Sequence, residues 1–576
     1  MVSKYRVRKM GTRHATAAGH YLAAQAAFQI LEAGGNVVDA GVAGGIAMAV
    51  VQSDMVNFAG VAPIMIRTAD TGEVVTITGL GHWPKAASAD RFRQDHGGRI
   101  PDGYLSTVVP AAPDAWITAL ERFGTMGFGE TAAAAIGFAR DGFPMNALMS
   151  DILKDHADEH RRWPSTAAVY FPNGRAPETG EIFYQRDLAR TLQYIVDEER
   201  GAASQSGRLR GLQAARDAFY RGDIAETMVR HYGENGGWLS RQDLAEFRVE
   251  IRPPVRVRLG NVEILSCGPW CQGPVLSQAL AILKGFDLKA LGHNSTAYIH
   301  TVVEAFKLAY ADRHYYYGDP NFVDVSIDAL VSDAYAGERR GLIDPRRASP
   351  GMPDPGNPQQ LGTGSSVSRS AIRADRPPAR EALDTSYICV VDARGNAFSA
   401  TPSDASYNGP IVPGLGIAPS SRGSQSWTDP NLPACLAPGK RPRLTPSPAI
   451  AVGADGWCMP FGSPGNDLQP QSMGQVLLNT LVFRMTLQDA VDAPRFGTFS
   501  FPRSSDPHLY TPGQLKVESS IAESVRAELT ALGHRVEAWP GHWWEAGSVC
   551  AALADVATGV VECAGDSRRP TGAIVR

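Results

Sequence analysis

Cysteine is scarce in this sequence, and its few cysteines are scattered. The 576 residues contain seven cysteines, an odd number that does not predict a disulfide framework. Cys267 and Cys271 stand close together, but no second pair or nearby histidine completes a zinc site. We therefore expect no disulfide-stabilised fold, no metal centre and no cofactor.

Long apolar runs and unbalanced charge are also lacking. The longest apolar run, residues 37–51, contains Asp39 and is too short to span a bilayer, so it predicts a buried helix. The basic N-terminal residues lead into Gly-Thr-Arg-His at 11–14 without the apolar core of a signal peptide. Lys plus Arg (55) nearly balance Asp plus Glu (59), and no long basic run carries interleaved aromatics. These absences predict a cytoplasmic protein that binds neither nucleic acid nor membrane.

What is present is the composition of a large globular protein, with 44% hydrophobic and 20% charged residues. Residues 21–33 have apolar positions at helical spacing and end at a Gly-Gly-Asn turn, where the next helix begins. Between residues 61 and 78 the period changes to two, which predicts a hairpin through 70–72. Helical patterns return from residue 112 to about 340.

The sharpest compositional boundary is the Pro-, Gly-, Ser- and Arg-rich stretch within residues 346–384, most marked up to Arg380, which we interpret as a mobile linker. Directly after it, residues 385–392 predict a strand, 393–396 a turn and 397–401 a second strand. A linker thus leads straight into a strand that starts with Thr385.

That position suits a nucleophile. A threonine hydroxyl needs a base at neutral pH, and if the peptide bond before Thr385 is cut, its freed amine, with a pKa of about 7.7 to 8.0, can serve. One residue then supplies both nucleophile and base. On this pattern alone, the alternative that Thr385 merely opens a strand remains open.

Six segments in a fixed order extend the pattern over almost the whole chain. They are residues 31–40 (LEAGGNVVDA), 219–225 (FYRGDIA), 304–313 (EAFKLAYADR), 385–397 (Thr385 through Val-Val-Asp to Gly-Asn-Ala), 438–442 (PGKRP) and 492–496 (DAPRF). Together they resemble the gamma-glutamyltransferase superfamily, and the register places the family's nucleophile on Thr385.

The resemblance implies an α+β fold, the four-layer αββα sandwich of N-terminal-nucleophile hydrolases. It also implies that the precursor cuts itself between Asp384 and Thr385. The mature enzyme would consist of a large subunit, residues 1–384, and a small subunit, residues 385–576, associated as αβ or (αβ)₂.

The resemblance further implies residues that assist Thr385. Gly465 and Asn466, in the turn Gly-Ser-Pro-Gly-Asn, take the places of the family's oxyanion-hole glycines, since backbone N–H groups in such a turn can approach a developing oxyanion. Ser403 stands where the family has a threonine whose hydroxyl supports the nucleophile. The plainer alternatives are a tight loop for the first motif and a strand or turn residue for Ser403.

Three parts of the family's glutamyl-binding site are changed. Leu80 stands where the family has the arginine that holds the substrate α-carboxylate. Leu444 and Thr445 replace a pair of serines, and residues 420–426 replace a segment whose acidic residue grips the α-amino group. The acyl group of the substrate is therefore expected to differ from glutamyl.

The altered segments look like the subgroup that contains oxamate amidohydrolase. In that setting Arg422 could bind an anionic end of the substrate, with Gln425, Thr445 and Asp467 as further candidate contacts. A surface arginine on a loop is the equal alternative for Arg422.

Three functional hypotheses follow. The leading one is a cytoplasmic, cofactor-free hydrolase of small amides, with possible acyltransferase activity, working through a threonyl ester at Thr385. The second is a true gamma-glutamyltransferase or glutathione hydrolase, against which the missing arginine at Leu80 speaks. The third is a non-catalytic homologue that is never processed and acts as a binding module.

Overall fold

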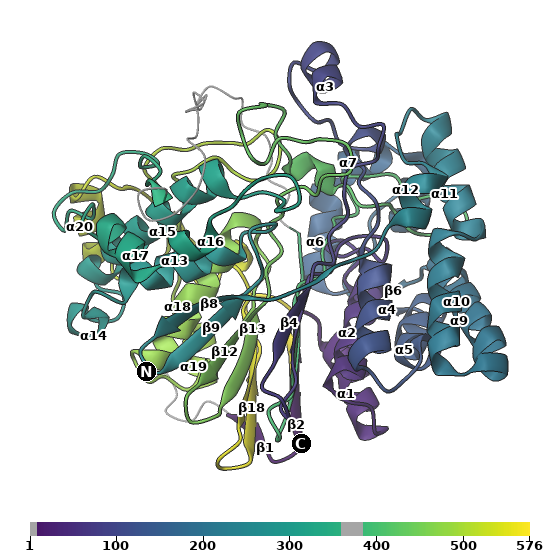
Figure 1. Cartoon of the computed structure of the whole chain (residues 1–576), viewed down its shortest axis with the longest axis horizontal. Helices are drawn as coiled ribbons and strands as arrows, with labels where there is room; N and C mark the ends of the chain where they lie inside the picture. The colour runs from purple at the N-terminus through teal and green to yellow at the C-terminus, as the bar shows by residue number, and fades with distance from the viewer. Residues whose placement is uncertain (1–7, 359–383) are drawn as a thin grey trace.

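The computed structural model describes residues 8–358 and 384–576, and its frame is a pair of seven-stranded sheets (Figure 1). From edge to edge, the first sheet consists of β1 (Lys9–Gly11), β18 (Val560–Ala564), β17 (Cys550–Asp555), β13 (Cys458–Gly462), β12 (Ala449–Gly453), β9 (Val262–Ser266) and β8 (Val255–Leu259). The second consists of β19 (Gly572–Val575), β2 (His14–Ala18), β10 (Ile388–Asp392), β11 (Ala397–Ala400), β3 (Ile64–Arg67), β4 (Val74–Ile77) and β7 (Ile251–Arg252). Neighbouring strands in both sheets pair antiparallel. Both sheets combine strands from the two sides of the expected cut.

Two groups of helices cover the outer faces, and Figure 1 shows the strands running between them. Against the second sheet pack α1 (Tyr21–Glu32) and α2 (Val37–Val51), and behind them lie α4 (Ala112–Phe123), α5 (Phe128–Asp141), α9 (Arg186–Ser206) and α10 (Arg208–Tyr220). Against the first pack α13 (Gly273–Leu283), α18 (Gln469–Leu481) and α19 (Leu487–Asp492), and behind α13 lie α15 (Thr296–Tyr316) and α17 (Asp333–Arg340).

Shorter elements complete the described chain. The remaining helices are α3 (Ala89–Asp95), α6 (Ala147–Asp155), α7 (Ala157–Arg161), α8 (Pro164–Tyr170), α11 (Asp223–Glu234), α12 (Arg241–Glu246), α14 (Leu288–Leu291), α16 (Ile327–Leu330) and α20 (Glu523–Ala531), with 3-10 turns η1 (Tyr104–Ser106), η3 (Arg422–Gln425), η4 (Asn466–Leu468) and η5 (Trp544–Ala546). Two small sheets contain β14 (Phe496–Thr498), β15 (Gln514–Glu518) and β16 (Arg535–Trp539), and β5 (Phe143–Pro144) and β6 (Ile182–Phe183).

The side chains of β10 show how four layers arise. Ile388 and Val390 belong to the core beneath α1 and α2, whereas Cys389 and Val391 belong to the core between the sheets. Successive residues of a strand point to opposite faces, so a strand apolar on both faces must be covered on both. The predicted αββα sandwich is confirmed.

The predicted buried helix over residues 37–51 is also confirmed, as α2, and all its residues are buried. It lies unusually close to the second sheet, because a Cβ on Gly41 or Gly44 would come within 2.1 Å of Phe398 or Ile388. The helix begins at an Asn36 capping box and ends at the segment that contacts Thr385.

Other expectations were less complete. The hairpin over residues 61–78 is confirmed as β3 and β4, but the helical region from 112 to 340 is interrupted by β7, β8 and β9. The segment 255–259 (VRVRL) alternates between buried and exposed positions, the signature of a half-covered strand. Most of the predicted linker, residues 359–383, lies outside the described residues. Within the part of the chain that is described, no helix combines the length and apolarity of a membrane span.

Candidate active site

Thr385 lies at the entry to β10, against the segment that follows α2. Its amide nitrogen donates to the Met55 carbonyl at 3.1 Å, and its carbonyl accepts a hydrogen bond from Arg569 Nη1 at 3.3 Å. The residue is fully buried and has a φ of 88°. A positive φ is disfavoured for a β-branched residue and costs on the order of 1–3 kcal/mol. The backbone at the expected cleavage point is therefore strained.

The Thr385 hydroxyl belongs to a buried polar cluster. Its Oγ1 lies 2.6 Å from Ser403 Oγ and donates to Asp384 Oδ1 at 3.1 Å. Ser403 is held in place by its own amide, which donates to the Val61 carbonyl at 2.9 Å. Arg422 Nη2 donates to both Ser403 Oγ and Asp384 Oδ2. Four residues that the sequence indicated separately thus meet in one place.

Arg422, at the start of η3, is 4% exposed, so its interpretation as a surface residue is wrong. Besides Asp384, its guanidinium faces Asp404 Oδ1 at 3.6 Å from Nε. Asp404 is fixed in turn by the hydroxyls of Ser420 at 2.7 Å and Ser421 at 3.0 Å. Burial opposes the charge of Arg422, but the two carboxylates outweigh burial and raise its pKa. The site therefore presents a permanently charged guanidinium to carboxylates.

The turn expected to form the oxyanion hole follows β13. Gly465 has a φ of 115° and Asn466 a φ of 49°, so two successive residues adopt positive φ. The turn lies close to the strand that Thr385 precedes, because a Cβ on Gly462 would come within 2.3 Å of the Tyr387 ring. Consecutive amides in such a turn can form a concave anion-binding surface. Donation by these two amides remains a prediction.

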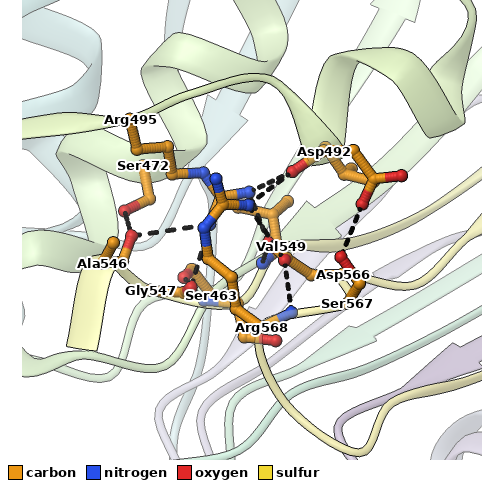
Figure 2. A network of polar contacts seen from close by, with 12 residues as sticks. Ser463, Ser472, Asp492, Arg495, Ala546, Gly547, Val549, Asp566, Ser567 and Arg568 are labelled. Atoms are coloured by element: carbon orange, nitrogen blue, oxygen red, sulfur yellow. Dashed lines mark hydrogen bonds and ion pairs between the residues drawn. The ribbon is translucent and has the colours of Figure 1, made fainter. Parts of the chain in front are cut away.

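A buried network supports this turn (Figure 2). Ser463 Oγ accepts a hydrogen bond from the Ser548 amide at 3.1 Å. Arg495 donates to the Gly547 carbonyl at 2.9 Å and forms an ion pair with Asp566. Burial opposes the charge of Asp566, but the pair with Arg495 leads the interactions that lower its pKa. The arginine of the DAPRF segment therefore has a structural role.

The candidate substrate contacts Gln425, Thr445 and Asp467 already have polar partners within the protein. Thr445 donates its amide to Gln425 Oε1 at 2.9 Å, and Gln425 Nε2 lies 3.1 Å from Thr445 Oγ1. Asp467 is paired with Arg313 and accepts a hydrogen bond from the Ser504 amide at 2.8 Å. Asp467 thereby anchors the turn, whereas substrate contact by these residues stays a prediction.

A cavity of about 250 Å³ adjoins the cluster and is lined by both Arg422 and Asn466. Charges of both signs surround it, contributed by Arg99, Asp102, Glu159, Arg503 and Asp506. The size and polarity of the cavity suit a small polar ligand.

A larger cavity, of about 650 Å³, is lined by residues within 165–188 and 411–416, away from the site residues indicated by the sequence.

One group of described residues has the composition of a metal site. Ligand atoms of His300, Glu304 and His534 lie within 4.8 Å of one another. However, His300 Nδ1 is hydrogen-bonded to His534 Nε2 at 2.9 Å, and Lys307 Nζ pairs with Glu304 at 2.7 Å. The ammonium already balances the carboxylate, so the group is a polar contact between α15 and the segment after α20.

Sequence reasoning missed three charged residues near Thr385. Asp404 directly follows Ser403, and its φ of 120° marks the kind of strained backbone found at functional sites. Arg569, near the C-terminus, donates a hydrogen bond to the Thr385 carbonyl, and no local sequence pattern could indicate a contact over this separation. Asp54 is buried beside them, and burial raises its pKa to about 7.

Comparisons with known proteins show the family of the chain. A sequence model described as gamma-glutamyltranspeptidase matches residues 23–575. The acylase ACY 1 proenzyme of Pseudomonas sp. (strain V22) is 33% identical over 539 residues, which cover 91% of this chain and 88% of that protein. The glutathione hydrolase proenzyme of Escherichia coli (strain K12) is 29% identical over 534 residues, covering 89% and 84% respectively. The crystal structure of cephalosporin acylase from Bacillus halodurans matches with a TM-score of 0.85 at 27% identity, covering 100% of this chain and 98% of that one. The chain therefore belongs to the gamma-glutamyltranspeptidase family of amide hydrolases.

Proposed function

We propose that this protein cuts itself before Thr385 and then hydrolyses small amides whose acyl group carries an anionic end. The observation that carries the proposal is the contact of the Thr385 hydroxyl with Ser403, beside the buried guanidinium of Arg422 and at a residue whose backbone φ is positive. Proenzymes among the relatives support processing into two subunits.

Turnover would follow the cut in two steps. The freed amine of Thr385 accepts the proton of its own hydroxyl, Oγ1 attacks the amide carbonyl, and the proton passes to the departing amine. The amides of Gly465 and Asn466 stabilise the oxyanion that forms. Water then attacks the threonyl ester, which releases the carboxylic acid and restores the hydroxyl.

Access to Thr385 would depend on the cut. In the uncut chain Thr385 is fully buried, and the Asp384 carboxylate forms an ion pair with Arg422. If Asp384 withdraws after cleavage, a buried guanidinium loses one carboxylate partner, and a substrate carboxylate can replace it because such a donor is costly to leave unpaired.

Asp384 also suggests the length of the acyl group. Its carboxylate, which contacts Arg422, is separated by two carbon atoms from the carbonyl that Thr385 attacks. An amide of succinic acid has the same spacing. Oxamate, with no intervening carbon, is the smallest anionic amide to try, and we expect longer homologues up to succinamate to fit better.

The rival function is gamma-glutamyl transfer or glutathione hydrolysis, as named for the Escherichia coli relative. Leu80, at the position of the family's carboxylate-binding arginine, is buried in the core between the sheets and offers no hydrogen bond. A gamma-glutamyl anilide separates the two functions. Efficient turnover that dipeptide acceptors accelerate would favour the rival.

A denaturing gel of purified protein tests the proposal directly. Cleavage before Thr385 divides the 61.6 kDa chain into pieces of about 41 and 20 kDa.

Thr385→Ala should leave a stable, uncut chain without amidase activity. Thr385→Ser should keep both activities at reduced rate, because the hydroxyl remains while the methyl group that restricts its rotamer is lost. A wild-type chain that stays whole would instead support the unprocessed, non-catalytic homologue, and normal cutting of Thr385→Ala would refute Thr385 as the nucleophile.

A further inference from the structure

The uncut chain lacks the base that turnover uses. In the precursor the nitrogen of Thr385 is a peptide amide that donates to the Met55 carbonyl at 3.1 Å. An amide nitrogen has no basic lone pair, so it cannot accept the proton of the Thr385 hydroxyl. If the chain cuts itself as proposed above, another group must take this proton in the first cut.

The hydrogen bonds around the hydroxyl give it a direction. Arg422 donates to Ser403 Oγ, which is 2.6 Å from Thr385 Oγ1. Because Ser403 Oγ accepts from the guanidinium, its own proton is free to point to Thr385. The Thr385 proton then points to Asp384 Oδ1, at 3.1 Å. The network runs from a permanent donor to a carboxylate, with Thr385 as the last donor.

Asp384 is held so that one oxygen remains for Thr385. Its Oδ2 accepts hydrogen bonds from Arg422 and, at 3.2 Å, from the Ala405 amide. Oδ1 is the atom that faces the Thr385 hydroxyl. The carboxylate is 1% exposed, so its orientation is set by these contacts and not by solvent.

We propose that the Asp384 carboxylate is the general base of the chain's own cleavage. Oδ1 takes the Thr385 hydroxyl proton while Oγ1 attacks the Asp384 carbonyl carbon. The carbon–nitrogen bond breaks, the proton passes from Oδ1 to the leaving Thr385 nitrogen, and an ester joins Asp384 to Oγ1. Water then hydrolyses this ester, leaving the α-carboxylate of Asp384 and restoring the Thr385 hydroxyl. Asp384 acts only once, because the cut leaves it as the last residue of the large subunit.

Other charged groups surround Asp384 and bear on the pH dependence. Arg422 faces it from η3. Asp404 and Tyr407 interact with its charge from the loop after β11, and Arg569 does so from the C-terminal segment. Asp54 interacts with Arg569 and Tyr407 in the same pocket, and its pKa is raised to about 7. If the cleavage rate falls at acid pH, the midpoint of that fall alone does not identify the residue that titrates. Substitution of Asp384 does.

The test follows cleavage of newly synthesised full-length chain. Chains are pulse-labelled in cell-free synthesis, transferred to buffers between pH 4 and 9, and followed on denaturing gels. We expect Asp384→Asn to slow cleavage by about 10²- to 10⁴-fold, the range of general-base catalysis, and to abolish an acid limb that the wild type shows. Asp404→Asn is the matched control, because it removes the other carboxylate at Arg422, and we expect it to slow cleavage less than about tenfold.

A second variant guards against misfolding. Asp384→Ala leaves space for formate, which should accelerate its cleavage in proportion to concentration and leave Asp404→Asn unaffected. Asp384→Asn cutting at the wild-type rate with the same acid limb would overturn the inference, as would equal losses in Asp384→Asn and Asp404→Asn. A wild-type chain that is never cut would overturn the proposed function as well, which distinguishes the two failures.

Discussion

Arg313 and Asp467 form a buried ion pair across the expected boundary between the subunits. Arg313 ends the EAFKLAYADR segment on α15, and Asp467 directly follows Asn466 in the turn after β13. Both side chains are at most 2% exposed. Burial opposes the charge of Asp467, but Arg313 leads the interactions that lower its pKa. A motif of the first 384 residues thus positions the turn near the nucleophile.

The first prediction concerns this pair. Asp467→Ala should destabilise the protein by about 3–5 kcal/mol, because it leaves the Arg313 charge buried without its partner. Arg313→Ala should have a similar effect, and the double variant should cost less than the sum of the two. Urea unfolding and kcat/KM measure the outcome. If Asp467→Ala raises KM at unchanged stability, Asp467 is a substrate contact instead.

The second prediction concerns Ser403, which touches the nucleophile. Ser403→Ala should slow both self-cleavage and amide hydrolysis by about 10- to 100-fold, because the Thr385 hydroxyl loses the group that orients it. Ser403→Thr, which keeps the hydroxyl, should lose much less. Ser386→Ala is the matched control, since Ser386 Oγ is buried and has no hydrogen-bond partner among the described residues. Equal losses in Ser386→Ala and Ser403→Ala would contradict an orienting role.

The third prediction concerns acyl length. For mature enzyme, kcat/KM should rise from oxamate through malonamate to succinamate and fall again at glutaramate. In Arg422→Ala, succinamate should lose some thirtyfold to several-thousandfold in kcat/KM, as expected when a buried charge partner is removed, while neutral propionamide should lose less, because it loses only the support that Arg422 gives to Ser403. Processing is checked on the same samples. An unchanged kcat/KM for all anionic amides would exclude Arg422 as the carboxylate site.

Local patterns predicted those parts of the fold that are locally determined. The helix at 37–51 and the hairpin at 61–78 follow from apolar spacing, and both are confirmed. The strand at 255–259 was missed although it alternates, because helical patterns surround it. The position of Thr385 came from the order of the motifs, whereas its contact with Arg569 joins residues far apart in the sequence. Such contacts depend on packing, which a single sequence does not reveal.

The fourth prediction concerns acid pH. Burial lowers the pKa of His20 and His534 to about 3 and of His160 to about 4. The unfolded chain binds these protons near pH 6.5, about where an unperturbed histidine titrates, so it holds more protons than the folded chain between about pH 6.5 and 4. Stability therefore falls as pH falls through this window. We expect a lower urea midpoint at pH 5 than at pH 7.5, and a smaller difference in His160→Gln than in the exposed control His542→Gln.

The fifth prediction separates two roles for Asn466. If its backbone amide donates to the oxyanion, Asn466→Ala keeps the donor and should lose less than about tenfold in kcat, since the φ of 49° costs a non-glycine residue little more than about 1 kcal/mol. If its side chain donates, the same change should cost about 10²- to 10³-fold. Asn466→Gly removes the side chain and the strain together. If the backbone amide is the donor, the kcat of Asn466→Gly should be equal to or higher than that of Asn466→Ala. A large loss of kcat in both variants with unchanged KM would assign the oxyanion contact to the amide side chain.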